Sequence, residues 1–153
     1  MAEDSSGEKY LNYQLGNESF ATPLIEVREV IEYRPAKPIP HTPKFFKGVI
    51  NIRGEIVGVI DLRDRLEIKS DVTPVTQLVF ETAAGPLAAI VDSVQSVTII
   101  LEKDIERRTA GQSSGSNRAY FLGVGKVNDK ILTLVSLRQI LTTEQLTEIH
   151  NKN

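Results

Sequence analysis

FKGVINIRGEIVGVID, residues 46–61, is the stretch that decides how this chain folds. Two runs rich in Val and Ile, 48–52 and 56–60, read as β-strands. Arg53-Gly54 separates them, and Gly54 can supply the positive φ that a tight hairpin needs. We therefore predict a β-hairpin with Arg53 at its tip.

A short helix is expected directly after this hairpin. Asp61 stands at the N-cap position, and Asp64 follows three residues later, where a capping box has its second polar residue. This pattern predicts a helix that runs through Leu66.

The same design returns in residues 121–141, which read FLGVGKVNDKILTLVSLRQIL against FKGVINIRGEIVGVIDLRDRL for 46–66. Asn128-Asp129 occupies the turn, and Ser136 replaces Asp61 as a cap. A fainter match aligns Phe20-Ala21 with Leu87-Ala88. The aligned turn, cap and following Leu-Arg favour an internal duplication.

The fold class predicted from this duplication is all-β. Several short strands in each unit favour small barrels, because closure removes exposed sheet edges. Units this small are marginal alone, so we expect two barrels packed around a shared core. The expected segments are a disordered lead-in (1–9), a first barrel (about 14–72), a second barrel (about 73–136) to which the first strand can contribute, and a closing helix (137–149).

Composition narrows the function classes. The chain has 153 residues, a net charge of -2 and no cysteine, which excludes disulfides and thiolate metal sites. His41 and His150 show no metal-ligand spacing, so no metal is expected. No apolar run approaches the roughly 20 residues of a membrane span. A small-barrel nucleic-acid-binding protein remains the alternative function, and it would need a local basic patch.

Catalytic chemistry is not indicated. The pairs Glu26/Glu29 and Asp61/Asp64 could act as catalytic carboxylates, but capping explains the second pair, and Glu26 is interpreted as a solvated charge. Arg53 has two readings. It is either an ordinary exposed turn arginine or an anchor that binds a carboxylate, with Glu29 as the intramolecular candidate.

The stretches 46–54 and 56–63 resemble the signature of CheW-like domains, as do Val27-Arg28-Glu29-Val30 and the proline-rich 38–43 before them. The resemblance spans residues 10–146. It implies two five-stranded SH3-like barrels without catalysis or cofactors. It also implies an adaptor that couples the cytoplasmic tip of methyl-accepting chemoreceptors to the regulatory domain of the histidine kinase CheA. Such a protein is cytoplasmic and a monomer when free, is recruited to receptor arrays through its partners, and contacts neither nucleic acid nor the membrane directly.

The resemblance also suggests binding residues. The family's paired Glu and Arg match Glu29 and Arg53, and its receptor-facing Val and Gly match Val27 and Gly48. Two neighbours, Lys47 and Asn51, complete the expected site, while Gly54 and Asp61 have structural roles as turn and cap. Gly58 and Ile52 stand where the family usually has Pro and Leu. A mobile surface loop is expected at 109–117.

Overall fold

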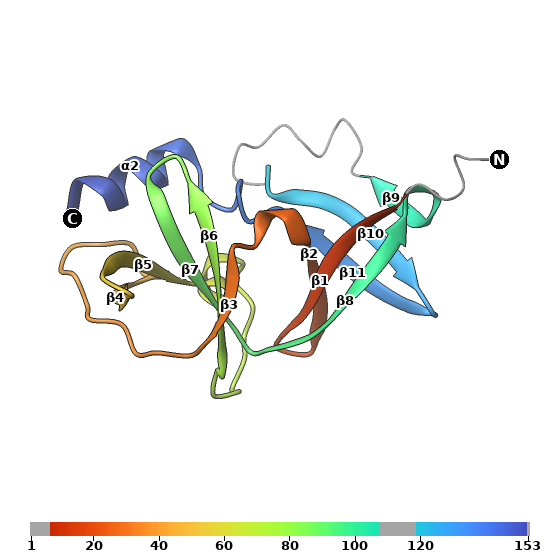
Figure 1. Ribbon diagram of the computed structural model, residues 1–153, viewed down its shortest axis with the longest axis horizontal. Coiled ribbons are helices and arrows are strands. Elements are labelled where there is room, and N and C mark those ends of the chain that lie inside the picture. Colours follow the sequence, from red (N-terminus) through yellow and green to blue (C-terminus); the bar gives the residue numbers. More distant parts are fainter. Residues whose placement is uncertain (1–6, 108–118, 153) are drawn as a thin grey trace.

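The computed structural model describes residues 7–107 and 119–152, without the side chains of 150–152. It is mostly β-strand, which confirms the all-β class. Two sheets lie next to one another along the long axis of the molecule (Figure 1). The predicted loop at 109–117 lies outside the described residues, as do the first six residues of the predicted lead-in.

One sheet has six strands in the order β8-β1-β2-β11-β10-β9. Its strands are β1 (Gly7–Leu15), β2 (Glu18–Pro23), β8 (Ser93–Leu101), β9 (Ile105–Arg107), β10 (Phe121–Val127) and β11 (Lys130–Val135). Residues 7–9 pair with β8, so they belong to β1 and not to a disordered lead-in. The first strand therefore joins the strands of the second half, as anticipated.

The other sheet has five strands in the order β3-β6-β7-β5-β4. Its strands are β3 (Glu29–Glu32), β4 (Phe46–Ile52), β5 (Glu55–Asp61), β6 (Thr76–Thr82) and β7 (Gly85–Val91). The proline-rich connector between β3 and β4 forms no strand of its own and meets β4 at one bridge, Lys37 to Val49.

The two predicted hairpins are confirmed and match in detail. Both β4–β5 and β10–β11 shift register at a glycine of positive φ, Gly48 in the first and Gly123 in the second. A Cβ at either glycine would overlap a neighbouring backbone carbonyl, so only glycine fits. Both two-residue turns also have positive φ throughout, as in type I′ hairpins.

The two repeats exchange strands. Hairpin β1–β2 pairs with β8 and β11, whereas hairpin β6–β7 pairs with β3 and β5. The parallel pairs match as well, because Ala21 lies opposite Leu134 and Ala88 lies opposite Val59. Each sheet therefore combines strands from both halves of the chain, so the expected division into barrels 14–72 and 73–136 is wrong.

The hydrogen-bonded ladders leave both sheets open, so neither forms the closed barrel that was expected. The five-stranded sheet is nevertheless strongly curved. Side chains from its two ends meet, since Arg53 at the β4–β5 turn reaches Glu29 on β3, and Arg34 after β3 reaches the Asn51 carbonyl on β4. Side-chain contacts therefore connect the two edge strands, β3 and β4, which no backbone ladder joins.

A shared core joins the sheets, as predicted. The central cluster takes residues from both sheets, including Tyr13 and Phe20 from one and Phe46 and Phe80 from the other. A smaller cluster fills each sheet on its own, around Ile52 in one and Ile100 in the other. The sheets thus bury apolar area against one another, which neither could do alone.

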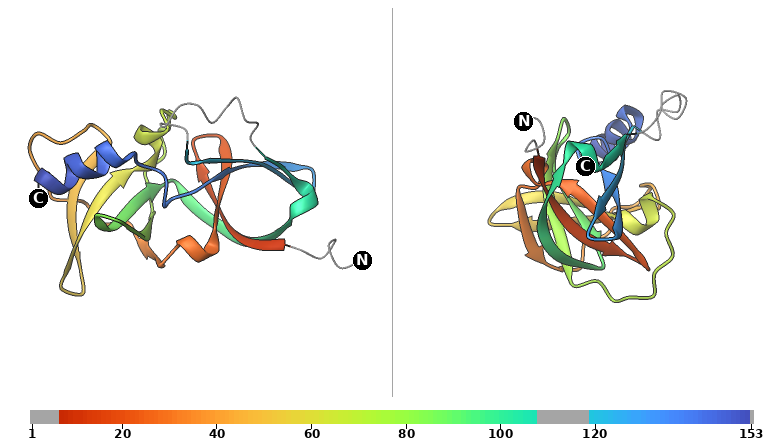
Figure 2. Two further views of the ribbon diagram at one scale, coloured as in Figure 1. Left: turned by 90° about the horizontal axis from the view of Figure 1, so that it is seen from above. Right: turned by 90° about the vertical axis from the view of Figure 1, so that its right-hand side faces the viewer.

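The helices differ partly from the prediction. Helix α1 (Leu62–Arg65) is capped by Asp61, whose carboxylate accepts from the backbone N–H of Arg63, as predicted. Helix α2 (Thr143–Lys152) begins later than the expected residue 137. Thr142 and Gln145 form a capping box that sets this start. Figure 2 shows α2 at the five-stranded end of the molecule and β9 at the opposite end.

Candidate functional site

Arg53 occupies a backbone conformation that its side chain does not favour. Its φ is 50°, and Gly54 follows with a φ of 90°. The Asn51 side chain supports the turn by accepting from the Gly54 N–H at 2.8 Å. Asn or Gly is the usual residue at such a position, and the matching turn has Asn128. Local conformation therefore does not explain why an arginine stands there.

Five charged side chains gather around this turn, and we call them the tip cluster: Arg28, Glu29, Arg53, Glu55 and Glu81. Arg53 Nη2 donates to Glu29 Oε2 at 2.5 Å, which confirms the contact expected between these residues. Arg28 donates to Glu55 at 2.9 Å and to Glu81 at 2.7 Å. Its Nε also lies 3.8 Å from the same oxygen of Glu29.

The tip cluster has three carboxylates and two guanidinium groups. Hydrogen bonds to Glu55, and then to Glu81, raise the pKa of Arg28, so this side chain stays cationic. The Arg53 side chain is 66% exposed, whereas that of Glu29 is 26% exposed. The cluster thus presents a guanidinium outward on a partly covered carboxylate, an arrangement suited to a charged group of another protein.

The remaining predicted binding residues do not join the tip cluster. Lys47 pairs with Asp64 at 2.8 Å, at the other end of β4. Gly48 is buried in the bulge below the connector, where the absence of a side chain lets the Lys37 carbonyl approach the backbone. Val27 is half-buried and packs against the central core. Only Asn51, Glu29 and Arg53 are brought together.

Two exposed apolar side chains flank Val27 along the chain. Ile25 is 75% exposed in the turn Leu24–Glu26, and Val30 is 47% exposed on β3. This segment crosses from one sheet to the other. Exposed apolar side chains therefore stand on either side of Val27, the residue that the resemblance assigns to the receptor contact.

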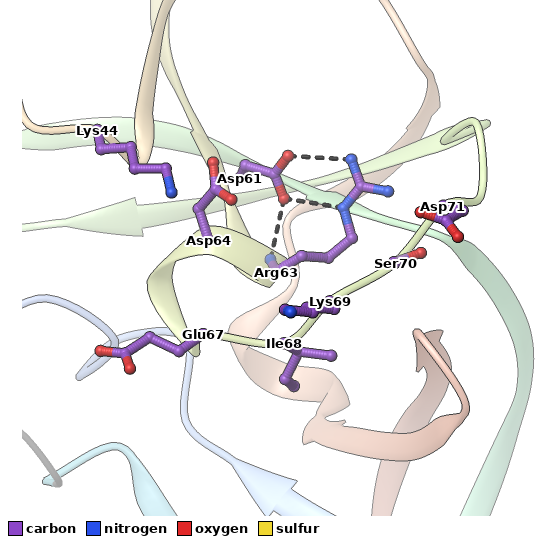
Figure 3. Close-up of a pocket in the computed structure, with 9 residues that line it drawn as sticks. All are labelled: Lys44, Asp61, Arg63, Asp64, Glu67, Ile68, Lys69, Ser70 and Asp71. Carbon is purple, nitrogen blue, oxygen red and sulfur yellow. Dashed lines mark hydrogen bonds and ion pairs between the residues drawn. The ribbon is translucent and has the colours of Figure 1, made fainter.

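A buried ion network lies beside a polar pocket, and its members are Asp61, Arg63 and Asp92. Arg63 contacts both oxygens of Asp61 at 3.0 Å and Asp92 Oδ1 at 3.1 Å. Its pKa is raised, chiefly by the hydrogen bonds to Asp61. Asp61 and Arg63 line a pocket of 760 Å³. Figure 3 shows the two side chains joined there, with Glu67 at the same pocket directed away from this ion pair.

Asp92 extends this network to the other sheet. Its Oδ2 accepts from the backbone N–H of Gly16, in the β1–β2 turn, at 2.8 Å, and from the Ser70 hydroxyl at 2.8 Å. The arginine therefore holds two carboxylates that are themselves satisfied by other donors. Such a closed network fixes the two sheets together and leaves Arg63 few donors for a ligand.

Several important contacts were missed from the sequence. Glu26 is not a solvated charge, because its carboxylate accepts from the Ser136 hydroxyl and from the Arg138 N–H. It thus caps the turn that corresponds to α1. Arg28, Glu55 and Glu81 were missed in the tip cluster because they lie far apart in the chain, and no local pattern signals their contact.

Other kinds of site were also sought among the described residues. Within residues 7–107 and 119–149, no group of three or more His, Asp or Glu side chains is placed so that it could hold a metal ion. No helix in the part of the chain that the structure describes is long and apolar enough to cross a membrane.

The geometry can now be compared with known proteins. The family model for the CheW-like domain matches residues 9–145, which is most of the chain. The chain belongs to the CheW-like domain family. A chemotaxis protein CheW from Klebsiella aerogenes is 29% identical, over 99% of this chain and 92% of that protein. Another from Rhizobium meliloti is 26% identical over 92% of each.

A solved structure supports the CheW-like fold. The scaffolding protein TtCheW from Thermoanaerobacter tengcongensis aligns with a TM-score of 0.79 and 28% identity, over 91% of this chain and 95% of that one.

The packing around β5 gives a reason for Gly58, which stands where the family usually has Pro. A Cβ there would meet Leu87 at 2.9 Å and Phe46 at 3.0 Å, so glycine lets these two side chains close over β5.

Proposed function

We propose that this protein is a non-catalytic scaffold that couples chemoreceptors to the histidine kinase CheA. The match to the CheW-like domain over residues 9–145 carries this proposal. The relatives named as chemotaxis proteins and the scaffolding protein of the same fold support it. The protein would act in the cytoplasm, at receptor arrays that it reaches through its partners.

The tip cluster is the proposed contact with the kinase regulatory domain. Among the described residues, the Arg53 side chain donates one hydrogen bond, to Glu29, and its other N–H groups would serve a partner. An arginine can bind a carboxylate through two parallel hydrogen bonds, and arginines are frequent among residues that dominate interfaces. Placing it on a strained turn position has a conformational cost, which a binding role explains.

The segment around Val27 is the proposed contact with the receptor. Ile25 and Val30 are exposed on either side of it, and we call these three residues the apolar strip. The cytoplasmic tip of a chemoreceptor is a helical hairpin, and its apolar side chains would cover this strip. The predicted roles of Gly48, Lys47 and Asn51 remain part of this proposal, with Gly48 shaping the backbone, Lys47 next to it in β4 and Asn51 at the β4–β5 turn.

Coupling follows from holding both partners on one rigid body. Residues 25–30 carry the apolar strip as well as Arg28 and Glu29 of the tip cluster, and Val27 in this segment packs against the shared core, so the two proposed contacts keep a fixed arrangement. A receptor change that favours one arrangement of the kinase is then passed on as a difference in binding free energy, without any chemical step.

Arg53→Asn tests the proposal. Asn suits the turn, so this variant should fold with an unchanged melting temperature. Its affinity for the purified kinase regulatory domain should fall by roughly 30-fold or more, the effect of losing an interface-dominating residue. Calorimetry with the regulatory domain and with a receptor hairpin fragment measures both contacts.

Asn128→Gly is the matched control, because it changes the corresponding turn of the other hairpin without removing a charge. It should bind the regulatory domain like the wild type. Unchanged affinity of Arg53→Asn for both partners would remove Arg53 from the site. A wild-type protein that bound neither partner would overturn the proposed function itself.

A further inference from the structure

We propose that Arg28 is a positioning residue that keeps Arg53 available to the partner by occupying Glu55 and Glu81. This inference rests on the proposed function, because it concerns the same docking surface. It assigns Arg28 a role that acts through Arg53.

The tip cluster contains a competition for Arg53. Three carboxylates lie near two guanidinium groups. A carboxylate that has no paired cation therefore attracts whichever guanidinium is less firmly held. Arg53 is the more exposed arginine, and in the part of the chain that the structure describes its side chain is held by a single hydrogen bond, to Glu29. Glu55 is only two residues away, at the start of β5. An unpaired Glu55 would draw Arg53 away from Glu29.

Arg28 pairs with the two other carboxylates, so that they do not compete for Arg53. Its Nη1 donates to Glu81 and its Nη2 donates to Glu55, so one planar group binds carboxylates from β6 and β5 at once. Its Nε also faces the Glu29 oxygen that accepts from Arg53. A lysine has a single ammonium group and does not reproduce this fork.

Stability does not account for the arrangement. The side chains of Arg28, Glu55 and Glu81 are 31%, 46% and 59% exposed. Ion pairs this exposed to solvent contribute little to folding. Their value is therefore geometric, since they fix which carboxylate Arg53 binds.

The test compares variants by their affinity for the kinase regulatory domain, with melting temperature as the check on folding. Arg28→Gln should bind at least about threefold more weakly, within the range of coupled neighbouring residues. Arg28→Lys should not restore binding. Adding Glu55→Gln and Glu81→Gln to Arg28→Gln should restore it, because no competitor remains. In an Arg53→Asn background, Arg28→Gln should have no further effect.

Glu106→Gln, on β9 in the other sheet, is the control for overall charge. Combined with Arg28→Gln it should not restore binding, and if it did, net charge and not position would be the cause. Unchanged affinity of Arg28→Gln would overturn the inference, as would a loss that Glu55→Gln and Glu81→Gln fail to repair. Either result leaves the proposed function standing as long as Arg53→Asn still weakens binding.

Discussion

Replacing Arg63 by methionine should be among the most damaging single changes in this protein. Methionine keeps the length and apolar body of the side chain but removes the guanidinium. Asp61 and Asp92 then lose their shared cation, while their side chains stay 9% and 3% exposed. The Val72 carbonyl also loses a 2.8 Å hydrogen bond.

The expected loss follows from this burial. Removing one member of a buried ion pair costs about 3–5 kcal/mol, because the remaining charge is left uncompensated away from water. The Arg63→Met variant should lose this amount of unfolding free energy. For a domain of this size, that corresponds to a fall in melting temperature of roughly 6–20 °C. A domain has only about 5–15 kcal/mol of unfolding free energy in total, so part of the variant population should unfold near physiological temperature.

Urea unfolding at neutral pH, followed by circular dichroism, measures the loss. Arg138→Met is the control, because Arg138 occupies the matching position, is exposed, and donates a side-chain hydrogen bond of 3.2 Å to the Ile25 carbonyl in place of a buried ion pair. It should change stability by less than about 0.5 kcal/mol. Adding Asp61→Asn and Asp92→Asn to Arg63→Met should recover at least about half of the loss, since Asn still caps the helix. An Arg63→Met variant within about 1 kcal/mol of the wild type would refute the argument.

Three further changes test other parts of the fold. Glu67 ends α1 with a φ of 59°, so Glu67→Gly should raise the unfolding free energy by about 0.5–1 kcal/mol in urea titrations, and any loss would count against strain there. Gly48→Ala should lower it by about 1–3 kcal/mol, because the new Cβ meets the Lys37 carbonyl; a stable variant would show that the bulge can adapt. A hydrogen bond from Arg107 lowers the pKa of Glu102, so its small stabilisation is present above the ordinary carboxyl range and disappears as pH falls through the lowered value. NMR titration should find the pKa of Glu102 higher in Arg107→Gln, and an unchanged value would show that the pair does not form in solution.

Much of the candidate site could be predicted because its signals are local. The hairpin with Arg53 at its tip follows from Gly54 and from alternating Val and Ile residues within sixteen positions. The Asp61 cap follows from its place before Leu62. The contact between Glu29 and Arg53 needed one further assumption, that their strands come close, and the curved five-stranded sheet meets it.

The closing helix was expected to begin at residue 137 but begins at Thr143, because the pattern before it belongs to a turn. Leu137, Ile140 and Leu141 have helical spacing, but all three are buried in the central core as part of a turn. Glu26, 110 residues earlier than Ser136, caps that turn from another element. A sequence pattern cannot distinguish the two cases, because both bury the same side chains.

The sequence by itself determined the strands, their turns and the duplicated design, since backbone preferences and capping act over a few residues. Only the tertiary structure decided which hairpin joins which sheet, that Arg28 holds Glu55 and Glu81, and that Arg63 joins carboxylates from two strands. Those pairings depend on burial between segments distant in the chain. Each repeat carries nearly the same pattern, so exchanged and unexchanged sheets satisfy the local rules equally, and packing of the common core selects between them.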